Sequence, residues 1–244
     1  MISHVILTWN LWDITNGLLN SLYRYTDEKY LQEIIIIDNG STDGTIAQVR
    51  IDPHIKHILL NKENAGFARS CNQGIHLATQ DLIAIWNNDT EVNENWLEPM
   101  LEQFGDYYMI GAAVVEPKTM TLRQWRENKT LNGSDLRRLD FAKGAPWIFK
   151  REVFDTIGYF DERFFPAQCE DSDFLLRMAL AKLKYGMWCG TVLYHHSACT
   201  QRHMLIPKYG EKYPWNTRQA FIEKWGTPDI DMARAYYEGD IHQR

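Results

Sequence analysis

A run of four consecutive isoleucines, Ile34–Ile37, ends abruptly in Asp38-Asn39-Gly40-Ser41. A short β-branched run bounded by turn residues is typical of a strand buried on both faces of a sheet. Similar apolar runs alternate with segments of helical periodicity. We expect strands at His4–Thr8, Ile34–Ile37, His57–Leu60 and Leu82–Trp86, and helices at Gly17–Tyr25, Thr42–Val49, Ala68–Ala78 and Trp96–Phe104. This alternation predicts an α/β fold with a mainly parallel central sheet and helices on both faces.

The second half of the chain is less regular. Further strands are expected at Gly111–Val115, Gly144–Phe149 and Thr191–Tyr194, with helices at Arg151–Ile157, Cys169–Lys182 and Ala220–Trp225. The polar stretch Glu116–Lys143 is predicted to be a loop, and Pro207–Gly226 is expected to wrap the surface. With no internal repeat or evident linker, the simplest organisation is one domain with an appended C-terminal segment.

The composition excludes several classes of protein. Of the 244 residues, 45% are hydrophobic and 24% are charged, which is usual for a globular chain and unlike a disordered or collagenous one. The formal net charge of −6 and the lack of a basic run argue against sequence-independent binding of nucleic acid. The four cysteines form no C-x-x-C pair, and the longest apolar run is much shorter than a transmembrane span. We therefore expect a cytoplasmic protein without a signal peptide.

Polar or ring-bearing residues follow each of the first four expected strands. Ligands of open parallel sheets bind outside the carboxyl ends of the strands. The residues at these ends are Thr8, Trp9 and Asn10; Asp38 and Asn39; Asn61 through Asn64; and Asn87 through Asp89. The sequence therefore predicts a ligand site at this rim of the sheet.

Two of the segments at the rim suit a nucleotide. In Asp38 through Thr45, the carboxylate that closes a buried strand can accept hydrogen bonds from a base or ribose, and the glycines allow a close backbone approach. In Asn64 through Asn72, a helix start offers N–H donors to an anion, and Arg69 adds positive charge. Each segment also has a purely local interpretation: an Asx turn with a helix N-cap at Ser41 or Thr42, and a plain turn–helix junction.

A third segment, Trp86 through Thr90, suits a cation. Asp89 can bind a hard divalent cation through oxygen, and Asn87 is spaced to supply a second, neutral oxygen. The alternative is an ordinary polar turn. Farther along the chain, His195 and His196 close an expected strand, and adjacent strand residues point to opposite faces, so at most one of them is expected to join the site.

The fourth segment, Cys169 through Arg177, begins with three carboxylates at an expected helix start. The helix dipole by itself stabilises carboxylates there, and Asp173 is spaced to pair with Arg177. However, Glu170-Asp171 follows the aromatic loop Phe164-Phe165-Pro166, which can place one carboxylate in a cleft. A general base needs only reach and a suitable pKa, so this pair is a candidate for one.

In combination, these segments resemble the nucleotide-sugar glycosyltransferases of family 2, which have the GT-A fold. The likeness is to the rhamnosyltransferase-like branch, whose members include rhamnosyl-, galactosyl- and N-acetylhexosaminyl-type transferases. The matching pieces are Ile37 through Thr45, Asn64 through Asn72, Asn87 through Thr90, Gly144 through Phe165, Glu170 through Asp173, His195 and Lys224-Trp225-Gly226. The resemblance implies a single GT-A domain over residues 1–226. It comprises a Rossmann-like nucleotide-sugar-binding half (1–110) and an acceptor-side half (111–200), while residues 201–244 are expected to pack on the domain.

The resemblance also implies roles for the residues at the rim. Thr8, Asp38 and the Asn64–Gly66 turn would hold the nucleoside. The whole set expected to bind the nucleotide sugar is Thr8, Asn10, Asp38, Asn39, Asn64, Gly66, Phe67, Arg69, Asn87 and Asn88. Asn87-Asn88-Asp89 stands in place of the D-x-D motif of the family, with Asp89 toward the metal and His195 completing the shell of a divalent cation, Mn²⁺ or Mg²⁺. Asn87 replaces the first Asp of that motif, which lowers the negative charge of the site by one.

By the same resemblance, Asp171 is the general base, with Glu170 beside it. The implied reaction is an inverting transfer from a UDP- or dTDP-linked sugar to a hydroxyl of a saccharide or glycoconjugate, as in polysaccharide biosynthesis. Cys169 stands where similar sequences usually carry an aromatic residue, which alters the acceptor side. The expected location is cytoplasmic, with a position at the membrane periphery left open. The sequence does not specify the donor sugar, the base of the nucleotide or the oligomeric state.

Two other functions compete with this interpretation. A sugar nucleotidyltransferase would carry a Gly-rich loop after the first strand, and Leu7 through Asp13 contains no glycine. A non-catalytic nucleotide-sugar or saccharide-binding module is disfavoured by the intact Glu170-Asp171 pair, although Asn87 keeps it open. Modified DNA as the acceptor is disfavoured by the net charge; the only local basic cluster is Arg123, Arg126, Arg137 and Arg138.

Overall fold

The computed structural model describes residues 1–115, 136–137, 146–196, 200–211 and 213–228. In these ranges the strands are β1 (Ile2–Thr8), β2 (Glu33–Asp38), β3 (Ile55–Leu60), β4 (Leu82–Asn87), β5 (Thr90–Glu91), β6 (Met109–Val115), β7 (Leu136–Arg137), β8 (Trp147–Lys150) and β9 (Tyr185–His195). The helices are α1 (Trp12–Tyr25), α2 (Thr45–Ile51), α3 (Phe67–Leu77), α4 (Glu98–Leu101), α6 (Glu152–Ile157), α7 (Glu170–Leu180), α8 (Ile206–Tyr209) and α9 (Tyr213–Trp225). A 3₁₀ turn at Glu28–Tyr30 and a π-helical segment at Gln201–Leu205 complete them.

The described strands form one sheet in the order β3-β2-β1-β4-β8-β6-β9-β5, and β7 pairs with β9. β3, β2, β1 and β4 are all parallel, as the alternation of strands and helices predicts. β8 is antiparallel to both of its neighbours, β6 and β9 pair in parallel, and β5 is antiparallel to β9. The sheet is therefore parallel in its N-terminal half and mixed in its C-terminal half, where β8 is inserted between parallel strands.

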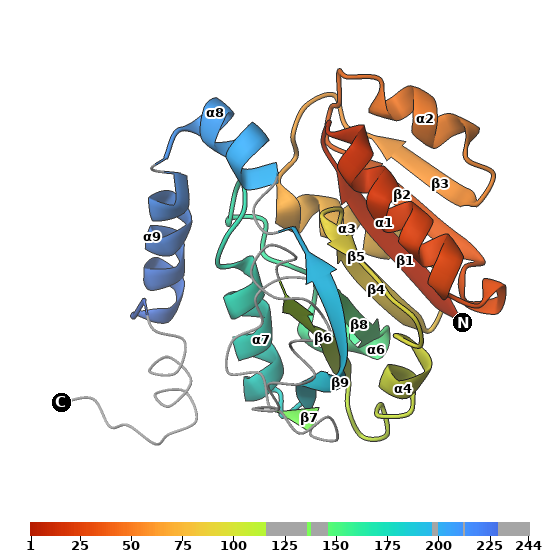
Figure 1. Cartoon of the computed structure of the whole chain (residues 1–244). Coiled ribbons are helices and arrows are strands. Elements are labelled where there is room, and N and C mark those ends of the chain that lie inside the picture. The colour runs from red at the N-terminus through yellow and green to blue at the C-terminus, as the bar shows by residue number, and fades with distance from the viewer. Residues whose placement is uncertain (116–135, 138–145, 197–199, 212, 229–244) are drawn as a thin grey trace.

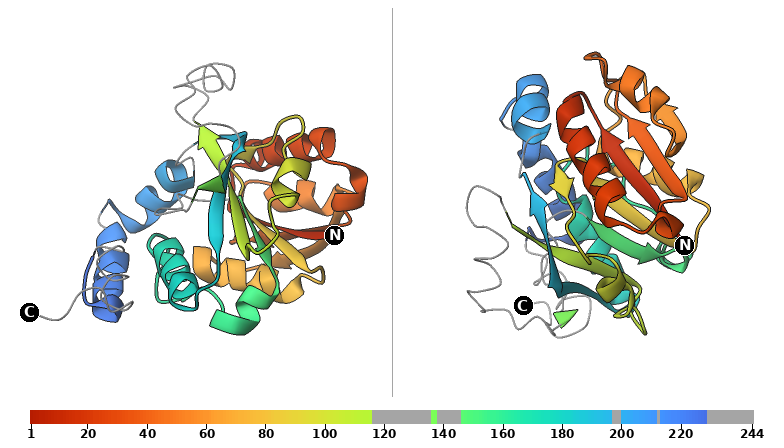
Figure 2. Two further views of the ribbon diagram at one scale, coloured as in Figure 1. Left: turned by 90° about the horizontal axis from the view of Figure 1, so that it is seen from below. Right: turned by 45° about the vertical axis from the view of Figure 1, so that its right-hand side comes forward.

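Both faces of the sheet are buried. Successive isoleucines of β2 pack into two different hydrophobic clusters, one on each face. Ile34 and Ile36 pack with α1 and α4 on one face, whereas Ile35 and Ile37 pack with α3, α6 and α7 on the other. Figures 1 and 2 show these two helical layers on either side of the sheet, with α9 lying outside α7. A run of four buried β-branched residues thus has the two-sided environment that its sequence predicts.

Several element boundaries differ from the sequence-based expectation. The helix expected at Trp96–Phe104 is limited to Glu98–Leu101, because Trp96 is fully buried against Trp86 and donates to Thr26 instead of starting a helix. The helix expected from Thr42 begins at Thr45, whose N–H and hydroxyl both donate to Asp43. The predicted N-caps Ser41 and Thr42 are therefore wrong.

Other expected elements are longer in the structure or lie outside the described residues. The strand expected at Thr191–Tyr194 is the end of the eleven-residue β9, and the helix expected at Ala220–Trp225 begins at Tyr213. The predicted loop Glu116–Lys143 lies outside the described residues except for β7, and so do Arg123, Arg126 and Arg138 of the basic cluster. None of the helices in the described ranges is long and apolar enough to cross a bilayer.

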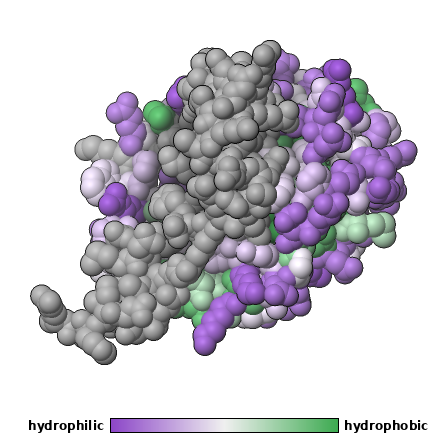
Figure 3. All heavy atoms as spheres, turned by 60° about the horizontal axis from the view of Figure 1, so that its bottom comes forward, coloured by the Kyte–Doolittle hydropathy of each residue, from purple (hydrophilic) through white to green (hydrophobic). Residues whose placement is uncertain are grey.

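On the face in Figure 3, hydrophilic residues predominate and hydrophobic ones occur as small separate patches. Trp215, Tyr159 and Phe165 are among the exposed large hydrophobic side chains. Of these three, Phe165 lies next to the predicted site.

Candidate active site

The strand register brings the polar residues of three strands to one rim. Thr8 at the end of β1 lies beside Asp38 at the end of β2, and Leu7 lies beside Asn87 at the end of β4. The next residue of the β2 turn, Asn39, donates its N–H to the Thr8 carbonyl at 2.8 Å. Thr8, Asp38 and Asn39 are all buried. The predicted ends of the parallel strands therefore meet at a single edge.

Asp38 has one carboxylate oxygen in use and one without a partner. Its Oδ1 accepts the N–H groups of Gly40 at 3.0 Å and Ser41 at 2.9 Å, which fixes the turn after β2. Its Oδ2 is buried, and no hydrogen bond to it is found among the described residues. A buried acceptor without a partner carries a desolvation cost that a bound donor would relieve. This oxygen is therefore suited to accept an N–H or O–H from a ligand.

Asn10 and Asn39 connect the loops of the rim to one another. Asn10, in a left-handed conformation, accepts the Thr42 N–H on its Oδ1 at 2.6 Å, and its own N–H donates to Ser41 Oγ at 2.6 Å. Asn39 Oδ1 accepts from Ser70 Oγ at 2.7 Å and from two donors of the 61–65 loop. In this structure, both amides that were expected to bind nucleotide hold the loops that form the site.

The turn before α3 contains a glycine that no other residue can replace without strain. Asn64 Oδ1 accepts the Gly66 N–H at 2.9 Å. Gly66 has a φ of +85°, and a Cβ there would lie 2.8 Å from a ring carbon of Phe165 and 3.1 Å from the Pro166 carbonyl oxygen. The loop that leads to α7 therefore sits directly on the Asn64–Gly66 turn.

Phe67, which the resemblance implies to bind the nucleotide sugar, makes contacts within the protein, and its binding role stays a prediction. Its side chain packs against the core under α3, and its N–H donates to the Pro166 carbonyl at 2.8 Å. One of the N–H groups predicted to meet an anion at the start of α3 is therefore already taken by protein. Arg69, two residues along the helix, is exposed at the adjacent pocket.

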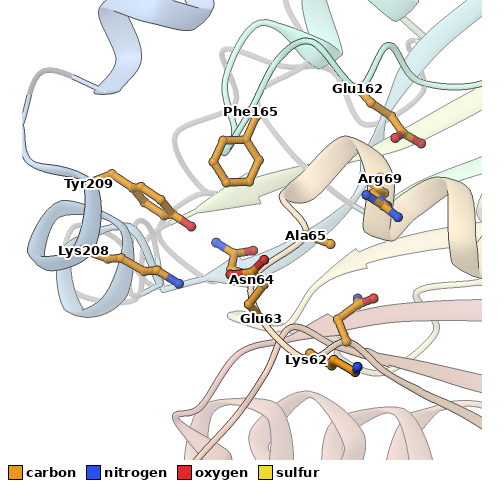
Figure 4. Close-up of a pocket in the computed structure, with 10 residues that line it drawn as sticks. Lys62, Glu63, Asn64, Ala65, Arg69, Glu162, Phe165, Lys208 and Tyr209 are labelled. Carbon is orange, nitrogen blue, oxygen red and sulfur yellow. The ribbon is translucent and has the colours of Figure 1, made fainter.

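A pocket of about 510 Å³ lies between this turn, the loop after α6 and α8 (Figure 4). Phe165 and Tyr209 meet edge to face at its mouth, with ring centroids 5.4 Å apart. The lining residues are Asn61, Lys62, Glu63, Asn64, Ala65, Arg69, Glu162, Phe165, Lys208 and Tyr209. Sequence reasoning named none of Glu162, Lys208 and Tyr209 as a site residue. Glu162 is marked only as part of the matching piece Gly144 through Phe165, and nothing local marks Lys208 or Tyr209.

The C-terminal segment reaches the end of β1. Leu205 is buried with Trp9, and Tyr209 and Ala167 pack against this pair. Lys208 places its Nζ 5.1 Å from the centroid of the Trp9 ring. Residues next to the first strand and residues 200 positions later thus form one wall of the site.

Asp89 and His195 are brought together by β5 and β9. The two-residue β5 follows Asp89 directly, and Thr90 pairs with His195 in antiparallel register. His195 Nε2 lies 3.1 Å from Asp89 Oδ1. His196 instead contacts Glu91 at 2.8 Å, so the two neighbouring histidines have separate partners, as strand alternation predicts.

The other two residues of the triplet make contacts of their own. Asn88 is buried, donates to Thr15 Oγ1 at 3.0 Å and accepts from Thr200 Oγ1 at 3.3 Å, so it connects α1 to the C-terminal segment. The backbone carbonyl of Asn87 accepts from Thr90 Oγ1 at 2.7 Å. Among the described residues, no three His, Cys, Asp or Glu side chains cluster to hold a metal. One carboxylate and one imidazole are nevertheless the donor types that Mn²⁺ accepts, so this pair fits a cation whose other ligands come from substrate and water.

Glu170 and Asp171 form the first turn of α7. Glu170 is buried, and its Oε2 has no hydrogen-bond partner among the described residues. Burial raises the pKa of Glu170 well above its ordinary value, and the neighbouring Asp171 carboxylate adds to this effect. Burial also raises the pKa of Asp171, although hydrogen bonds from Ser172 oppose the change. The pair thus holds protons more tightly than ordinary carboxylates do.

The remaining polar residues of this turn have other functions. Asp173 is fully buried and pairs with Arg177 at 2.9 Å, as their spacing predicts. Burial and the two neighbouring carboxylates raise the pKa of the Cys169 thiol to about 11, so it stays protonated at neutral pH. Asp171, which is partly exposed, is the member of the group best placed to meet solvent or substrate.

The family model described as Glycosyl transferase family 2 matches residues 3–158, more than half of the sequence. The chain belongs to glycosyl transferase family 2. One protein that this family 2 chain resembles is poly-beta-1,6-N-acetyl-D-glucosamine synthase of Staphylococcus aureus (strain MSSA476). It is 28% identical over 174 residues, which cover 66% of this chain and 42% of the synthase. The chain therefore spans less than half the length of this curated relative.

Solved glycosyltransferases share the fold of this family 2 chain. The crystal structure of GalNAc-T7 with UDP, GalNAc and Mn²⁺ has a TM-score of 0.67 at 15% identity, covering 98% of this chain and 54% of that one. The mannosyltransferase PcManGT from Pyrobaculum calidifontis, in complex with GDP-Man and Mn²⁺, has a TM-score of 0.66 at 18% identity, covering 97% and 69%. The expected GT-A fold is thereby confirmed.

Proposed function

We propose that this chain transfers a sugar from a nucleotide-diphosphate sugar to an acceptor hydroxyl, with inversion at the anomeric carbon. One observation carries the proposal: in a family 2 chain, Asp89 and His195 are paired at 3.1 Å beside the strand ends that hold Thr8 and Asp38. Asp171 lies in the first turn of α7, and the loop before this helix contacts the Asn64–Gly66 turn. These contacts support one site formed from segments far apart in sequence.

The donor is proposed to lie along the carboxyl ends of β1, β2 and β4. Asp38, with its unpartnered Oδ2, would accept from the base, while Thr8 and the Asn64–Gly66 turn enclose the nucleoside. A UDP- or dTDP-linked donor is our expectation. Two of the similar proteins have names that support an N-acetylhexosaminyl donor, whereas the third is a mannosyltransferase with GDP-Man. A place in the rhamnosyltransferase-like branch stays a prediction.

Asp89 and His195 are proposed to hold Mn²⁺ or Mg²⁺. When bound, the cation would act as a Lewis acid that stabilises the negative charge developing on the nucleoside diphosphate. The protein supplies one carboxylate there, because Asn87 and Asn88 are neutral. We therefore expect the cation to bind together with the diphosphate and only weakly in its absence.

Asp171 is proposed to remove the proton of the acceptor hydroxyl. As the acceptor oxygen forms its bond to the anomeric carbon, the bond from that carbon to the diphosphate oxygen breaks, and the proton passes to the Asp171 carboxylate. The nucleoside diphosphate leaves with the electron pair. This single displacement inverts the anomeric centre and needs no covalent enzyme intermediate. A raised pKa suits a base, since proton transfer is most effective when the pKa approaches the working pH.

The acceptor is proposed to be a saccharide or glycoconjugate. The pocket of Figure 4 offers aromatic faces and both signs of charge, which is compatible with a polar, ring-shaped ligand. The cytoplasmic location, with access to a membrane surface, is also part of the proposal. A non-catalytic binding module remains the second candidate, because Asn87 leaves the motif one carboxylate short.

The test is a transfer assay with the purified protein, UDP-, dTDP- and GDP-sugars, Mn²⁺ or Mg²⁺, and a panel of saccharide acceptors. The measured quantity is the nucleoside diphosphate that is released. We expect release with at least one donor, and proton NMR of the product should show the opposite anomeric configuration. Retention of configuration would overturn the inverting mechanism. Calorimetric donor binding without turnover on any acceptor would favour the binding module.

A further inference from the structure

Where α9 packs on α7, side chains of α9, of α7 and of the loop from α6 to α7 form a network of ion pairs and hydrogen bonds. Lys224 of α9 places its Nζ 2.6 Å from Asp173 Oδ1 and 2.7 Å from Asp161 Oδ2. Trp225 Nε1 donates to the same Asp173 oxygen at 2.9 Å. Arg177 Nε donates to the other oxygen, Oδ2, at 2.9 Å. We call these five residues the α9 clamp; Figure 2 shows the two helices side by side.

The clamp is buried at its centre. The Asp173 side chain has no exposed surface, while Arg177 and Lys224 are 17% and 21% exposed. A buried carboxylate is tolerated only when charge and hydrogen bonds compensate for its lost hydration, and here both of its oxygens are satisfied. Loss of the Lys224 ammonium would therefore disturb the first turn of α7 and not only α9.

The two carboxylates that Lys224 contacts lie before and after the proposed base, Asp171, in the sequence. Asp173 is two residues beyond Asp171 in the same helical turn, and Asp161 lies in the loop from α6 to α7. The same loop carries Phe165 and Pro166, which contact the Asn64–Gly66 turn. Lys224 thus connects the turn that carries the proposed base with the loop that touches the proposed donor turn.

A second set of contacts holds this loop from the opposite side. Asn72 of α3 accepts the Phe160 N–H at 2.9 Å and donates to the Phe160 carbonyl and to Glu162 Oε1. Arg177 also donates to the carbonyls of Ile157 and Tyr159. The loop is therefore attached to α3, α7 and α9. Its attachment to α9 combines the packing of Phe164 on Phe221 with the ion pair that Lys224 makes to Asp161.

We propose that Lys224 is a positioning residue for the transfer reaction: through Asp173 and Asp161 it sets the place of Asp171 relative to the donor. This role rests on the proposed function. Lys224 and Trp225 lie outside residues 3–158, so the family match assigns them nothing. Lys224 acts on the reaction only through other residues, and its effect belongs in kcat rather than in donor affinity.

The test compares Lys224→Met, which keeps the aliphatic stem, with Arg163→Met as a matched control. Arg163 pairs with Asp161 as well, but it is 51% exposed and is not part of the clamp. We expect Lys224→Met to lower kcat by about 10- to 100-fold, because small misplacements of reacting groups have effects of that order. Calorimetric donor Kd should change less than about twofold, and Lys224→Arg should restore most of kcat. Arg163→Met should match the wild type.

Hydrogen exchange separates positioning from simple stability. In Lys224→Met we expect faster exchange in residues 158–173 as well as in α9. Unchanged kcat, or faster exchange confined to α9, would overturn the positioning role. An inactive wild type would overturn the proposed function and this role with it, whereas an active wild type with an equally active variant would overturn only this role. If Lys224→Met does not fold, Trp225→Phe, which removes one donor to Asp173 and keeps an aromatic ring, is measured in the same way.

Discussion

The Nε2 atom of His195 lies 3.1 Å from Oδ1 of Asp89, across 106 positions of sequence. The contact depends on the short β5, which turns back immediately after Asp89 and pairs with the last residues of β9. It joins the parallel half of the sheet to the mixed half at the rim that carries the proposed donor site. The pair is also the one place in the described chain where we expect a divalent cation.

Replacement of Asp89 by Ala should abolish the metal dependence of donor binding. The remaining imidazole supplies one ligand, and loss even of an outer-shell partner costs about 10- to 100-fold in metal affinity. Titration calorimetry with a nucleotide sugar, with Mn²⁺ and with a chelator, measures this. The control is His196→Ala, which removes the neighbouring imidazole that contacts Glu91 and should leave binding unchanged. Wild-type affinity that is equal with metal and with chelator would refute the metal assignment.

Replacement of Asp171 by Asn should lower kcat by about 100- to 10,000-fold, the usual contribution of a general base, while donor Kd stays close to that of the wild type. Because burial raises the pKa of Asp171 and the base must be ionised, the wild-type kcat/KM should rise with pH above the ordinary aspartate range. This rise of kcat/KM with pH should be absent in Asp171→Asn. The exposed Glu102→Gln serves as the control. Near-normal turnover in Asp171→Asn would move the base elsewhere, first to Glu170 or Asp173.

Replacement of Glu170 by Gln should stabilise the protein at neutral pH. The folded-state pKa of Glu170 is raised, so its favourable contribution is present below the ordinary carboxylate pKa and is lost as pH rises toward the folded value. Urea unfolding at about pH 7.5 and about pH 4 should show the gain mainly at the higher pH. The exposed Glu102→Gln should show no such pH dependence. An equal effect of Glu170→Gln at both pH values would contradict the assigned burial.

Replacement of Gly66 by Ala should destabilise the protein more than replacement of Gly210. The two glycines have nearly the same backbone, with φ and ψ of 85° and 163° against 79° and 166°. Each substitution carries a backbone cost of about 1–3 kcal/mol in this region. A Cβ at Gly210 meets nothing within 4 Å, whereas at Gly66 it meets Phe165 and the Pro166 carbonyl. The exposed Phe165 ring can turn aside, so we expect about 1 kcal/mol of additional loss at Gly66.

Denaturant unfolding of the two variants measures that difference. Equal losses for Gly66→Ala and Gly210→Ala would show that the loop before α7 does not rest on the donor turn. Because the two variants share the backbone term, the comparison isolates the contact itself.

The sequence predicted the parallel half of the sheet because its signals are local. Ile34–Ile37 is buried on both faces whatever strand lies beside it, and the polar residues after it mark the rim. The mixed half depends on pairing between distant segments, such as β8 with β4 and β6, which no local pattern encodes. Trp96 illustrates the same limit: its tertiary contacts with Trp86 and Thr26 prevent the helix that its neighbours favour.

The sequence singled out strand ends that the structure brings to one rim, but not what each side chain does there. Asp38 lies at this rim and Asp89 contacts His195, while their roles stay predictions. Asn10, Asn39 and Asn88 connect loops in the structure, and the half-buried Phe67 packs against the core. An amide or a ring at the rim can serve the fold as well as a ligand. Lys208 and Tyr209 could not be predicted, and Lys224 was marked only by the resemblance, since their contacts depend on where α8 and α9 pack.

A crystal structure with Mn²⁺ and a UDP-linked N-acetylhexosamine tests the central claim most directly. We expect the uracil base to lie at Asp38 and the cation to lie between Asp89, His195 and the diphosphate. The Asp171 carboxylate should face the anomeric carbon, with space between them for one acceptor hydroxyl. A nucleotide bound elsewhere, or Asp171 separated from the sugar by packed core, would contradict the account.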